Sequence, residues 1–380
     1  MSALKEYKGS RYIAEKQVLV IDVGHAYTKF GFVSEAAPRG IVRSEIKCPN
    51  TDTIRNIFSY KDQNDLYELL VEFLHNIFFK RIMISAKDIK VVNVESPLVT
   101  TEFRNILTKV LFRHFEVGAI MFLPTHLVTT CTLACQTILV LDVGYEEASV
   151  IPIYEGVPIL KAWQALPLGA KAVHKTIMKA MQEILTEEEC TEKLIEDIKV
   201  RTCFVTTMER SAKLLTDNPP TPPPNVKYFT KRSLEIPGTV RESAFEKLWE
   251  RDLDNLSIPT MILDSIIKCP IDARKPLAEN ILLIGGTVMT TGFITRLKSE
   301  LEHIVNSEPY SEKLTLRKFK FHTAPSKPNY TAWLGGAIFG IAADLPSRCL
   351  SKEAYLETNH VPDWVCLIDN RKDDGENIEY

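Results

Sequence analysis

One pattern occurs twice in this chain and constrains its fold more than any other feature. In each copy an apolar run ends in Asp-Val-Gly, turns, and resumes as a second apolar run. The first copy joins residues 18–22 to residues 28–33, and the second joins 138–142 to 148–154. Runs rich in β-branched residues on either side of a tight turn predict a β-hairpin. The recurrence therefore predicts an internal duplication, and a further strand at 281–284 runs into Gly-Gly-Thr.

Length and charge narrow the class of protein. A chain of 380 residues exceeds the roughly 250 to 300 residues at which a single core stops growing, so we expect two lobes. The formal net charge of −3 gives no electrostatic footprint for nucleic acid or an anionic membrane. The polar N-terminus and the lack of an apolar run of about 18 residues argue against a signal peptide and a membrane anchor. Eight cysteines without a Cys-x-x-Cys pair are interpreted as buried thiols of a cytoplasmic protein.

Helical patterns alternate with the strands, which predicts an α/β chain. The spacing of apolar residues predicts helices over 66–79, 169–184, 242–268 and 292–305. Asp65 is predicted to cap the first of them, with Glu68 completing a capping box. Five of the six residues 219–224 are proline, which predicts a stiff polyproline II segment, interpreted as a surface loop in preference to a docking ligand. Residues 373–380 are expected to fray.

The duplicated turns suggest a chemistry. A strand that ends in Asp-x-Gly and turns back points several backbone N–H groups at one spot, which is how proteins cradle phosphate oxygens. Asp22 and Asp142 could hold the water shell of Mg²⁺, which takes few protein ligands, and Lys29 could neutralise a phosphate. One Asp-x-Gly is also an ordinary turn. Two copies with Gly285-Gly286-Thr287 at a third strand end are more specific.

These motifs resemble those of actin and the actin-related proteins. The two turns, residues 22–32 and 142–156, are similar to the family's phosphate loops, and residues 267–275 with 285–289 are similar to its adenosine-side signature. Ala324-Pro325, Trp333 to Gly336 and Ser351 to Tyr355 match its C-terminal region in order, so the resemblance covers residues 18 to about 358. It implies a two-lobed α/β fold with duplicated five-stranded-sheet domains, an interlobe nucleotide cleft and a reduced second subdomain.

The resemblance also implies boundaries. Subdomain 1 would comprise 17–43, 60–133 and 338–370, the reduced subdomain 2 would be 44–59, subdomain 3 would comprise 134–168 and 256–337, subdomain 4 would be 169–255, and 1–16 and 371–380 would be tails.

A nucleotide site follows from the same resemblance. The implied cofactor is ATP or ADP with Mg²⁺, held weakly as structural filler or lost altogether, with Asp22 and Asp142 reaching the metal through water. The implied contact residues are Asp22, Gly24, His25, Ala26, Lys29, Asp142, Gly144, Tyr145, Lys199, Gly285, Gly286, Thr287 and Met289.

Departures from the family pattern predict that the chain is not an enzyme. Cys131 and Ser149 stand where hydrolysing members align water with a Gln and a His. A Glu146 carboxylate about 4 Å from a phosphate would be repelled by about 4 kcal/mol at an effective dielectric near 20, so it is expected to turn outward. Val200 and Asn329 replace a Glu and a Lys on the nucleoside side.

The short stretch between Pro38 and Asn64 implies loss of the segment that inserts into the next protomer of a filament. The opposite face would keep an apolar docking groove with Val157, Pro158, Ile338, Phe339 and Ile341. A subunit with one docking face caps a filament and does not extend it.

Finer features indicate which partners the resemblance implies. Residues 201–204, the prolines before Asn225 and residues 361–364 are most similar to the family member at the pointed end of dynactin. The implied partners are actin-related filament subunits of dynactin, its other pointed-end subunits and, indirectly, dynein in transport on microtubules, with no nucleic acid and no direct membrane contact. The alternatives are a nuclear actin-related subunit of a chromatin remodeller and an ATP-hydrolysing enzyme of the same fold.

Overall fold

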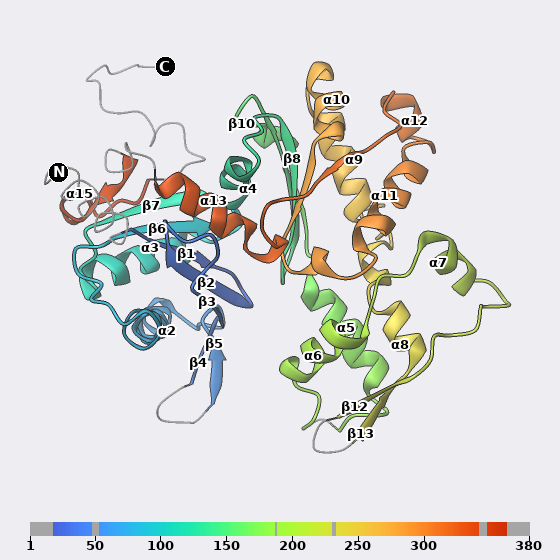
Figure 1. Ribbon diagram of the computed structural model, residues 1–380, viewed down its shortest axis with the longest axis horizontal. Coiled ribbons are helices and arrows are strands. Elements are labelled where there is room, and N and C mark those ends of the chain that lie inside the picture. The colour runs from blue at the N-terminus through green and yellow to red at the C-terminus, as the bar shows by residue number, and fades with distance from the viewer. Residues whose placement is uncertain (1–17, 48–52, 187, 230–232, 342–347, 363–380) are drawn as a thin grey trace, which may run out of the picture. The chain divides into compact units, whose positions relative to one another are not determined.

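Both predicted hairpins are present, each in a sheet of its own. The computed structural model describes residues 18–47, 53–186, 188–229, 233–341 and 348–362 (Figure 1). The chain divides into two compact units, one formed by residues 1–133 and 332–380 and the other by 134–331. The predicted tails, the fraying end, Cys48, Cys366 and residues 363–364 of the finer motif lie outside the described residues. The four subdomain boundaries stay a prediction.

Unit 1 is built on a mixed sheet with the strand order β16-β7-β6-β1-β2-β3. β1 is buried along its whole length and pairs in parallel with β6 and antiparallel with β2. Its described elements are β1 (Val18–Val23), β2 (Tyr27–Phe32), β3 (Gly40–Arg43), β4 (Glu45–Lys47), β5 (Ile54–Asn56), α2 (Gln63–His75), η1 (Asn76–Ile82), β6 (Lys90–Glu95), α3 (Thr101–Lys109), η2 (Val110–His114), β7 (Ala119–Pro124), α4 (Thr125–Thr129), η3 (Thr130–Thr132), α13 (Thr331–Gly340, whose first residue belongs to unit 2), β16 (Leu350–Ser351) and α15 (Lys352–Thr358).

The core of unit 1 lies between this sheet and its helices. Leu66, Leu70 and Phe73 of α2 are buried there against Leu19 and Ile21 of β1 and the aromatic side chains of α3 and η2. Trp333 on α13 is fully buried, and its indole Nε1 donates to the Val20 carbonyl at 3.2 Å. This bond joins α13 to β1, the strand that leads into the first turn.

Unit 2 repeats the arrangement with the order β10-β9-β8-β14-β15, and β11 pairs with β9. Its described elements are β8 (Ile138–Val143), β9 (Ala148–Tyr154), β10 (Val157–Pro158), η4 (Leu160–Ala162), β11 (Gln164–Leu166), α5 (Ala170–Met181), α6 (Glu192–Thr202), α7 (Met208–Leu214), β12 (Val226–Phe229), β13 (Ser233–Ile236), α8 (Gly238–Ser243), η5 (Glu246–Leu248), α9 (Ile258–Lys268), α10 (Ile271–Glu279), β14 (Ile281–Ile284), η6 (Thr287–Met289), α11 (Phe293–Ile304), α12 (Tyr310–Lys313), β15 (Phe321–His322) and η7 (Pro328–Tyr330).

The two hairpins occupy equivalent places in the two sheets. β8 pairs antiparallel with β9 and in parallel with β14, as β1 does with β2 and β6. The α/β architecture is therefore confirmed. Each main sheet has six strands where five were expected, because short edge strands such as β16 and β11 add to it.

Two of the predicted helices need correction. The cap of α2 is Asp62, whose side chain accepts from the backbone N–H of Asn64 and Asp65, and Asp65 itself is paired with an arginine. The predicted helix over 242–268 is broken into α8, η5 and α9, because Ser257 and Thr260 form a capping box that begins a new helix.

Two further expectations concern burial and the membrane. Among the described cysteines Cys203 and Cys269 are buried, whereas Cys131, Cys135, Cys190 and Cys349 are only partly covered, which corrects the expectation of uniformly buried thiols. None of the described helices is long and apolar enough to cross a membrane.

Candidate functional site

The first turn connects β1 to β2 and is closed by its own backbone. Gly24 N–H donates to the Tyr27 carbonyl at 3.2 Å, and a Cβ on Gly24 would lie 2.8 Å from that oxygen. Asp22 and Lys29 are opposite each other in the hairpin, and their side chains form an ion pair of 3.0 Å. The turn thus needs glycine, and its carboxylate and ammonium lie together at the strand end.

The carbonyl side of the first turn is held by the short segment that follows. Ser44 Oγ donates to the Gly24 carbonyl at 2.5 Å, and Ser44 N–H donates to the Ala26 carbonyl at 3.0 Å. Asn56 Nδ2 donates to the His25 carbonyl at 2.8 Å. The segment expected to be the reduced second subdomain contains the paired short strands β4 and β5. It is bonded to the turn through Ser44, which precedes β4, and Asn56, the last residue of β5.

Ring stacking reinforces this attachment. The His25 imidazole stacks on Phe58 at a centroid distance of 4.0 Å, and Phe58 stacks on Phe103 of α3 at 4.6 Å. The side chain of His25 is thereby engaged within unit 1, as the Gly24 N–H is engaged by the Tyr27 carbonyl.

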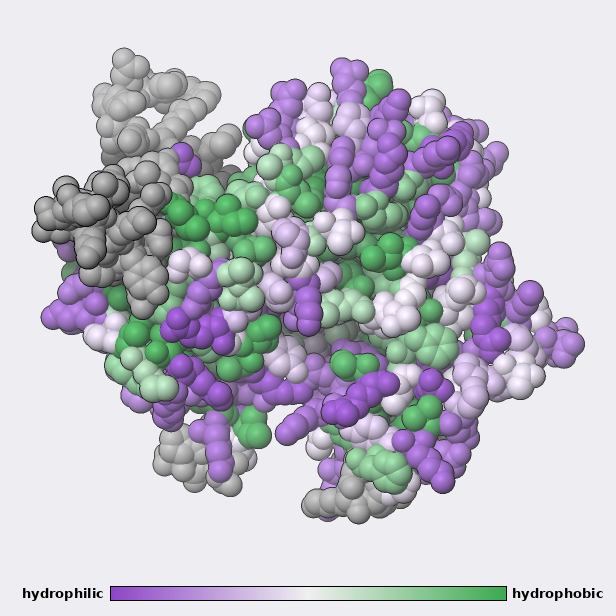
Figure 2. Space-filling view, viewed as in Figure 1, coloured by the Kyte–Doolittle hydropathy of each residue, from purple (hydrophilic) through white to green (hydrophobic). Residues whose placement is uncertain are grey.

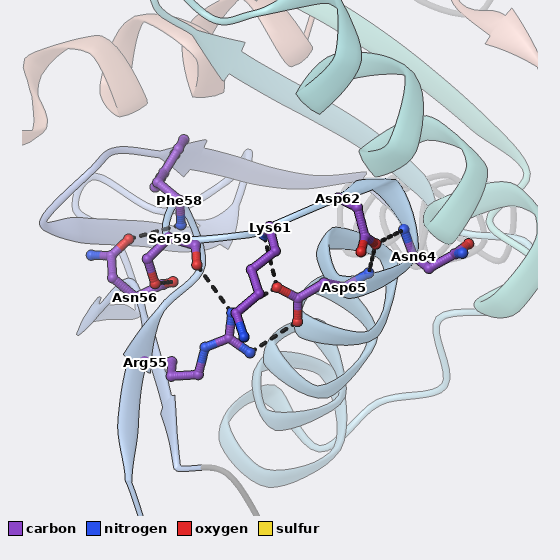
Figure 3. Close-up of polar contacts among 8 residues, drawn as sticks. All are labelled: Arg55, Asn56, Phe58, Ser59, Lys61, Asp62, Asn64 and Asp65. Atoms are coloured by element: carbon purple, nitrogen blue, oxygen red, sulfur yellow. Dashed lines mark hydrogen bonds and ion pairs between the residues drawn. The ribbon is translucent and has the colours of Figure 1, made fainter.

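The start of α2 fixes the other end of the same segment (Figure 3). The Arg55 guanidinium donates to both carboxylate oxygens of Asp65, at 2.9 and 2.7 Å, and also to the Ser59 carbonyl. The backbone N–H of Lys61 donates to Asp65 as well, at 2.9 Å. The hydrogen bond from Arg55, followed by that from Lys61, lowers the pKa of Asp65 to about 2.

The second turn connects β8 to β9 and is buttressed from two sides. Gly144 N–H donates to the Glu147 carbonyl at 3.0 Å. The Gly144 carbonyl accepts from Ala170 N–H at 3.0 Å and from Thr287 Oγ1 at 2.8 Å. The carbonyls of this turn, like those of the first, are used by the protein.

Two glycines permit this close packing. A Cβ on Gly169 would lie 2.3 Å from the Tyr145 carbonyl oxygen. Gly285 has a φ of +96°, and a Cβ there would lie 2.3 Å from the Val143 carbonyl and 2.7 Å from Asp142 Oδ1. The structure therefore brings Asp142, Gly144, Gly285 and Thr287 together, and their binding of a nucleotide stays a prediction.

Glu146 is not a free charge beside the second turn. Lys171 Nζ donates to both of its carboxylate oxygens, at 2.8 and 3.0 Å. The repulsion that was expected between Glu146 and a phosphate is thus reduced by a cation from α5. The outward orientation of Glu146 stays a prediction.

A polar cluster beside the second turn was missed by sequence reasoning. Lys199 Nζ lies 2.9 Å from His174 Nε2, and His174 Nδ1 lies 2.6 Å from Glu192 Oε2. Because an ammonium only donates, Nε2 is the acceptor and Nδ1 carries the proton that binds Glu192. The other oxygen of Glu192 accepts from the Tyr145 hydroxyl at 2.9 Å.

This cluster joins the turn to the helices α5 and α6. His174 is 2% exposed. The hydrogen bond from His174 lowers the pKa of Glu192, and burial followed by the hydrogen bond to Glu192 raises the pKa of Tyr145. The predicted nucleotide contacts Lys199 and Tyr145 are therefore both committed to internal partners. No spacing in the sequence indicates the pairing, because His174 and Glu192 lie on different helices.

The residues present fit an adenine nucleotide on some sides and not on others. Both turns use carbonyls internally, and the N–H groups of Gly24 and Gly144 also donate within their own turns, so only the other N–H groups of each turn would suit phosphate oxygens. On the nucleoside side, Gly285 N–H donates to the Pro328 carbonyl, and the next residue, Asn329, has a buried Oδ1 with no hydrogen-bond partner among the described residues. Such an acceptor suits an exocyclic amino group. Gly286 is open and Met289 is 45% exposed, whereas Lys199 does not fit.

Ser149 and Cys131, which are expected to stand in place of the family's water-aligning pair, lie in different surroundings. Ser149 is 3% exposed and lies opposite Asp142 in the hairpin. Cys131 is half-buried on η3, and burial raises the pKa of its thiol, which keeps it protonated. Neither side chain supplies an amide or an imidazole.

The predicted docking residues are accessible in each unit taken by itself. Val157 is 65% exposed and Pro158 half-buried in unit 2. In unit 1 Ile338 is 40% and Ile341 50% exposed, with Phe339 between them and the Arg348 guanidinium 5.8 Å from its ring. Figure 2 shows hydrophobic surface over α13.

Comparisons with known proteins agree with this architecture. The family model for actin matches residues 13–218 and 186–365. Actin-related protein 10 from Dictyostelium discoideum is 28% identical over 433 aligned residues, which cover 93% of this chain and 90% of that protein. Putative actin-29 from the same organism is 26% identical over 384 aligned residues, which cover 89% and 94%.

Proposed function

This chain belongs to the actin family, and we propose from that premise that it is a non-polymerising subunit that caps the pointed end of the actin-related filament of dynactin. In that place it would support dynein-driven transport on microtubules, in the cytoplasm and on the cytoskeleton. Its similarity to Actin-related protein 10 over 93% of the chain supports the choice within the family.

One observation carries the capping proposal. The region between Pro38 and Asn64 is bonded to its own first turn by Ser44 and Asn56 and to α2 by Arg55. The described residues of this region, 38–47 and 53–64, are thus tied to their own unit, which supports the proposal that the region does not insert into a neighbouring subunit. The face that carries the exposed apolar residues of α13 would dock on a filament, whereas the face that carries the region between Pro38 and Asn64 would not accept a further subunit. A head-to-tail contact of this kind does not propagate.

A substitution on α13 tests the docking face. Ile338→Asp would place a charge on the face that is proposed to meet the filament. We expect incorporation of this variant into filaments to fall more than about tenfold, because burying an unpaired carboxylate costs more free energy than losing the apolar contact. Co-sedimentation with actin-related filaments measures the effect. Ile271→Asp, at a residue 78% exposed on α10, is the matched control. Unchanged incorporation of the Ile338 variant would rule out this face.

We also propose that the protein retains an adenine nucleotide weakly and does not turn it over. Each turn would offer backbone N–H groups to phosphate oxygens and an aspartate, Asp22 in one unit or Asp142 in the other, to the water shell of Mg²⁺, and Asn329 would accept from the adenine amino group. The phosphates of the bound nucleotide would supply negative charge that the backbone N–H groups of the turns complement. The nucleotide would not be hydrolysed.

The nucleotide proposal has its own test. Asn329→Leu should lower the adenine nucleotide released on denaturation by about tenfold, the value of one polar contact, without lowering the melting temperature, because it removes an unpaired buried oxygen. Chromatography of the released nucleotide and thermal unfolding give the two readings. A nucleotide content equal to that of the wild type would exclude Asn329 from the site. Phosphate release from ATP that Asp142→Ala abolishes would show that the protein is an enzyme.

A further inference from the structure

The proline-rich segment between α7 and β12 has a regular pattern of exposure. Figure 1 shows it as a chain without helix or strand. Pro220 and Pro223 are partly covered, whereas the residues on either side of them, Pro219, Thr221, Pro222 and Pro224, are exposed. A repeat of three residues is that of a polyproline II helix, in which residues i and i+3 lie on one edge. One edge of the segment therefore faces the protein and two adjacent edges face solvent.

The covered side is anchored by arginines. Arg210 Nη2 donates to the Thr221 carbonyl at 2.8 Å, and Arg241 Nη1 donates to the Pro224 carbonyl at 2.6 Å. Arg210 is itself held by Glu242, whose side chain is 2% exposed, at 2.7 Å.

A glycine completes the seat of this segment. A Cβ on Gly238 would lie 1.7 Å from the Pro223 carbonyl oxygen, so only glycine allows the approach. The backbone N–H of Gly238 also donates to Asn225 Oδ1 at 3.0 Å. The segment is thus ordered by the protein itself, and a partner would pay little conformational entropy to bind it.

The exposed chemistry suits one kind of partner. Residues 218–225 contain no charged side chain, and proline rings are the main groups on the two exposed edges. Exposed Asp217 precedes the run and exposed Lys227 follows it, which gives the segment opposite charges at its two ends. Aromatic side chains that line a groove bind proline rings of a preformed polyproline II helix, and flanking charges set its direction.

We propose that residues 218–225 are a docking rib for a partner subunit with an aromatic-lined groove, acidic near the Lys227 end and basic near the Asp217 end. This proposal depends on the proposed function in one respect: the partner is expected to be another subunit of the assembly that contains this chain. The arginine anchors would present the rib, and the exposed rings of Pro219 and Pro222 would enter the groove.

Hydroxyl-radical footprinting of the full chain, free and in the purified assembly, tests the rib. We expect oxidation of Pro219 and Pro222 to fall in the assembly by on the order of fivefold, as in a water-excluded interface core. Leu253, which is 102% exposed elsewhere in unit 2, is the internal reference. Equal oxidation of both prolines in the two samples would overturn the proposal.

A variant and a cross-link identify the occupant. The double variant Pro219→Ser, Pro222→Ser keeps the backbone carbonyls of Thr221 and Pro224 that the arginines bind, so it should fold like the wild type. It should nevertheless fail to bind the partner subunit. The control variant Leu253→Ser should fold and bind the partner as the wild type does. A photo-reactive side chain at position 222 should cross-link to a surface rich in Trp or Tyr. Cross-links to a surface without aromatic residues, or to a second copy of this chain, would also overturn the proposal. If the wild-type chain fails to co-purify with actin-related filaments, the proposed function fails instead.

Discussion

At the scale of single residues, two acidic side chains three positions apart have different roles. Asp62 caps α2, while Asp65 accepts two hydrogen bonds from Arg55 and ties the segment that contains β5 to that helix. A bidentate pair of this kind has fixed geometry, which makes it stronger than most ion pairs near a surface. Asp65 therefore helps to hold the segment that the capping proposal needs in place.

The pKa of Asp65 predicts how this contribution depends on pH. The pKa is about 2 in the folded protein against an ordinary 3.8, so the pair stabilises the fold above pH 3.8 and loses its effect as the pH falls toward 2. We expect Asp65→Asn to lower the free energy of unfolding by about 1 kcal/mol at pH 7 after solvent screening. Urea unfolding as a function of pH should show the two proteins converging below pH 3.8.

The control for this prediction is an exposed pair. Lys247 and Glu250 are 52% and 58% exposed, so Glu250→Gln should change the free energy of unfolding by less than about 0.5 kcal/mol. A deficit of the Asp65 variant that stays constant down to pH 2 would mean that packing, and not charge, is the cause.

At the scale of elements, the second turn depends on Gly169, the residue just before α5. The Tyr145 and Gly144 carbonyls accept from the first N–H groups of the helix, which is possible only because Gly169 leaves room for them. The unsatisfied N–H groups of a helix start are thereby used to hold a turn of the sheet. The turn and the helix are expected to lose their order together.

Two glycine substitutions test that dependence. Gly169→Ala should lower the free energy of unfolding by about 2 to 3 kcal/mol, because the new Cβ would lie 2.3 Å from the backbone oxygen of Tyr145. Gly286→Ala is the control, since nothing lies within 4 Å of a Cβ there and its φ is −72°. Thermal unfolding of both variants gives the comparison, and an equal effect at the two positions would contradict the account.

The sequence predicted those features of the fold and the site that are set by residues a few positions apart. The hairpins, the Asp-x-Gly turns and β14 with Gly285 follow from runs of β-branched residues and from glycine, whose effects act within a few positions. The predicted cap at Asp65 was wrong because Asp62 caps the helix three residues earlier, which leaves Asp65 in the first turn, where Arg55 binds it. The break before α9 was missed although Ser257 and Thr260 carry its signal.

Long-range polar pairs were beyond sequence reasoning. His174 and Glu192 lie on different helices, and their bond depends on how α5 packs against α6. No spacing rule relates two such residues, because tertiary packing sets their distance. The commitment of Lys199 to His174, which changes the expected nucleotide site, could be found only in the structure.

At the scale of the whole molecule, the account rests on an asymmetry between two faces. Ser44 and Asn56, in the described part of the region between Pro38 and Asn64, are bonded within unit 1, while Ile338 and Ile341 stay exposed. A head-to-tail contact that can be made once cannot repeat, so such a subunit ends a filament. The family assignment makes actin-related filaments the natural target of that single contact.

The most direct test is to count labelled molecules on filaments. Fluorescently labelled full-length protein, mixed with actin-related filaments and imaged singly, should give one label per filament, at the pointed end, and no fibres when incubated alone at any concentration. Labels distributed along the filaments, or long fibres formed by the protein by itself, would contradict the central claim that it is a terminal subunit.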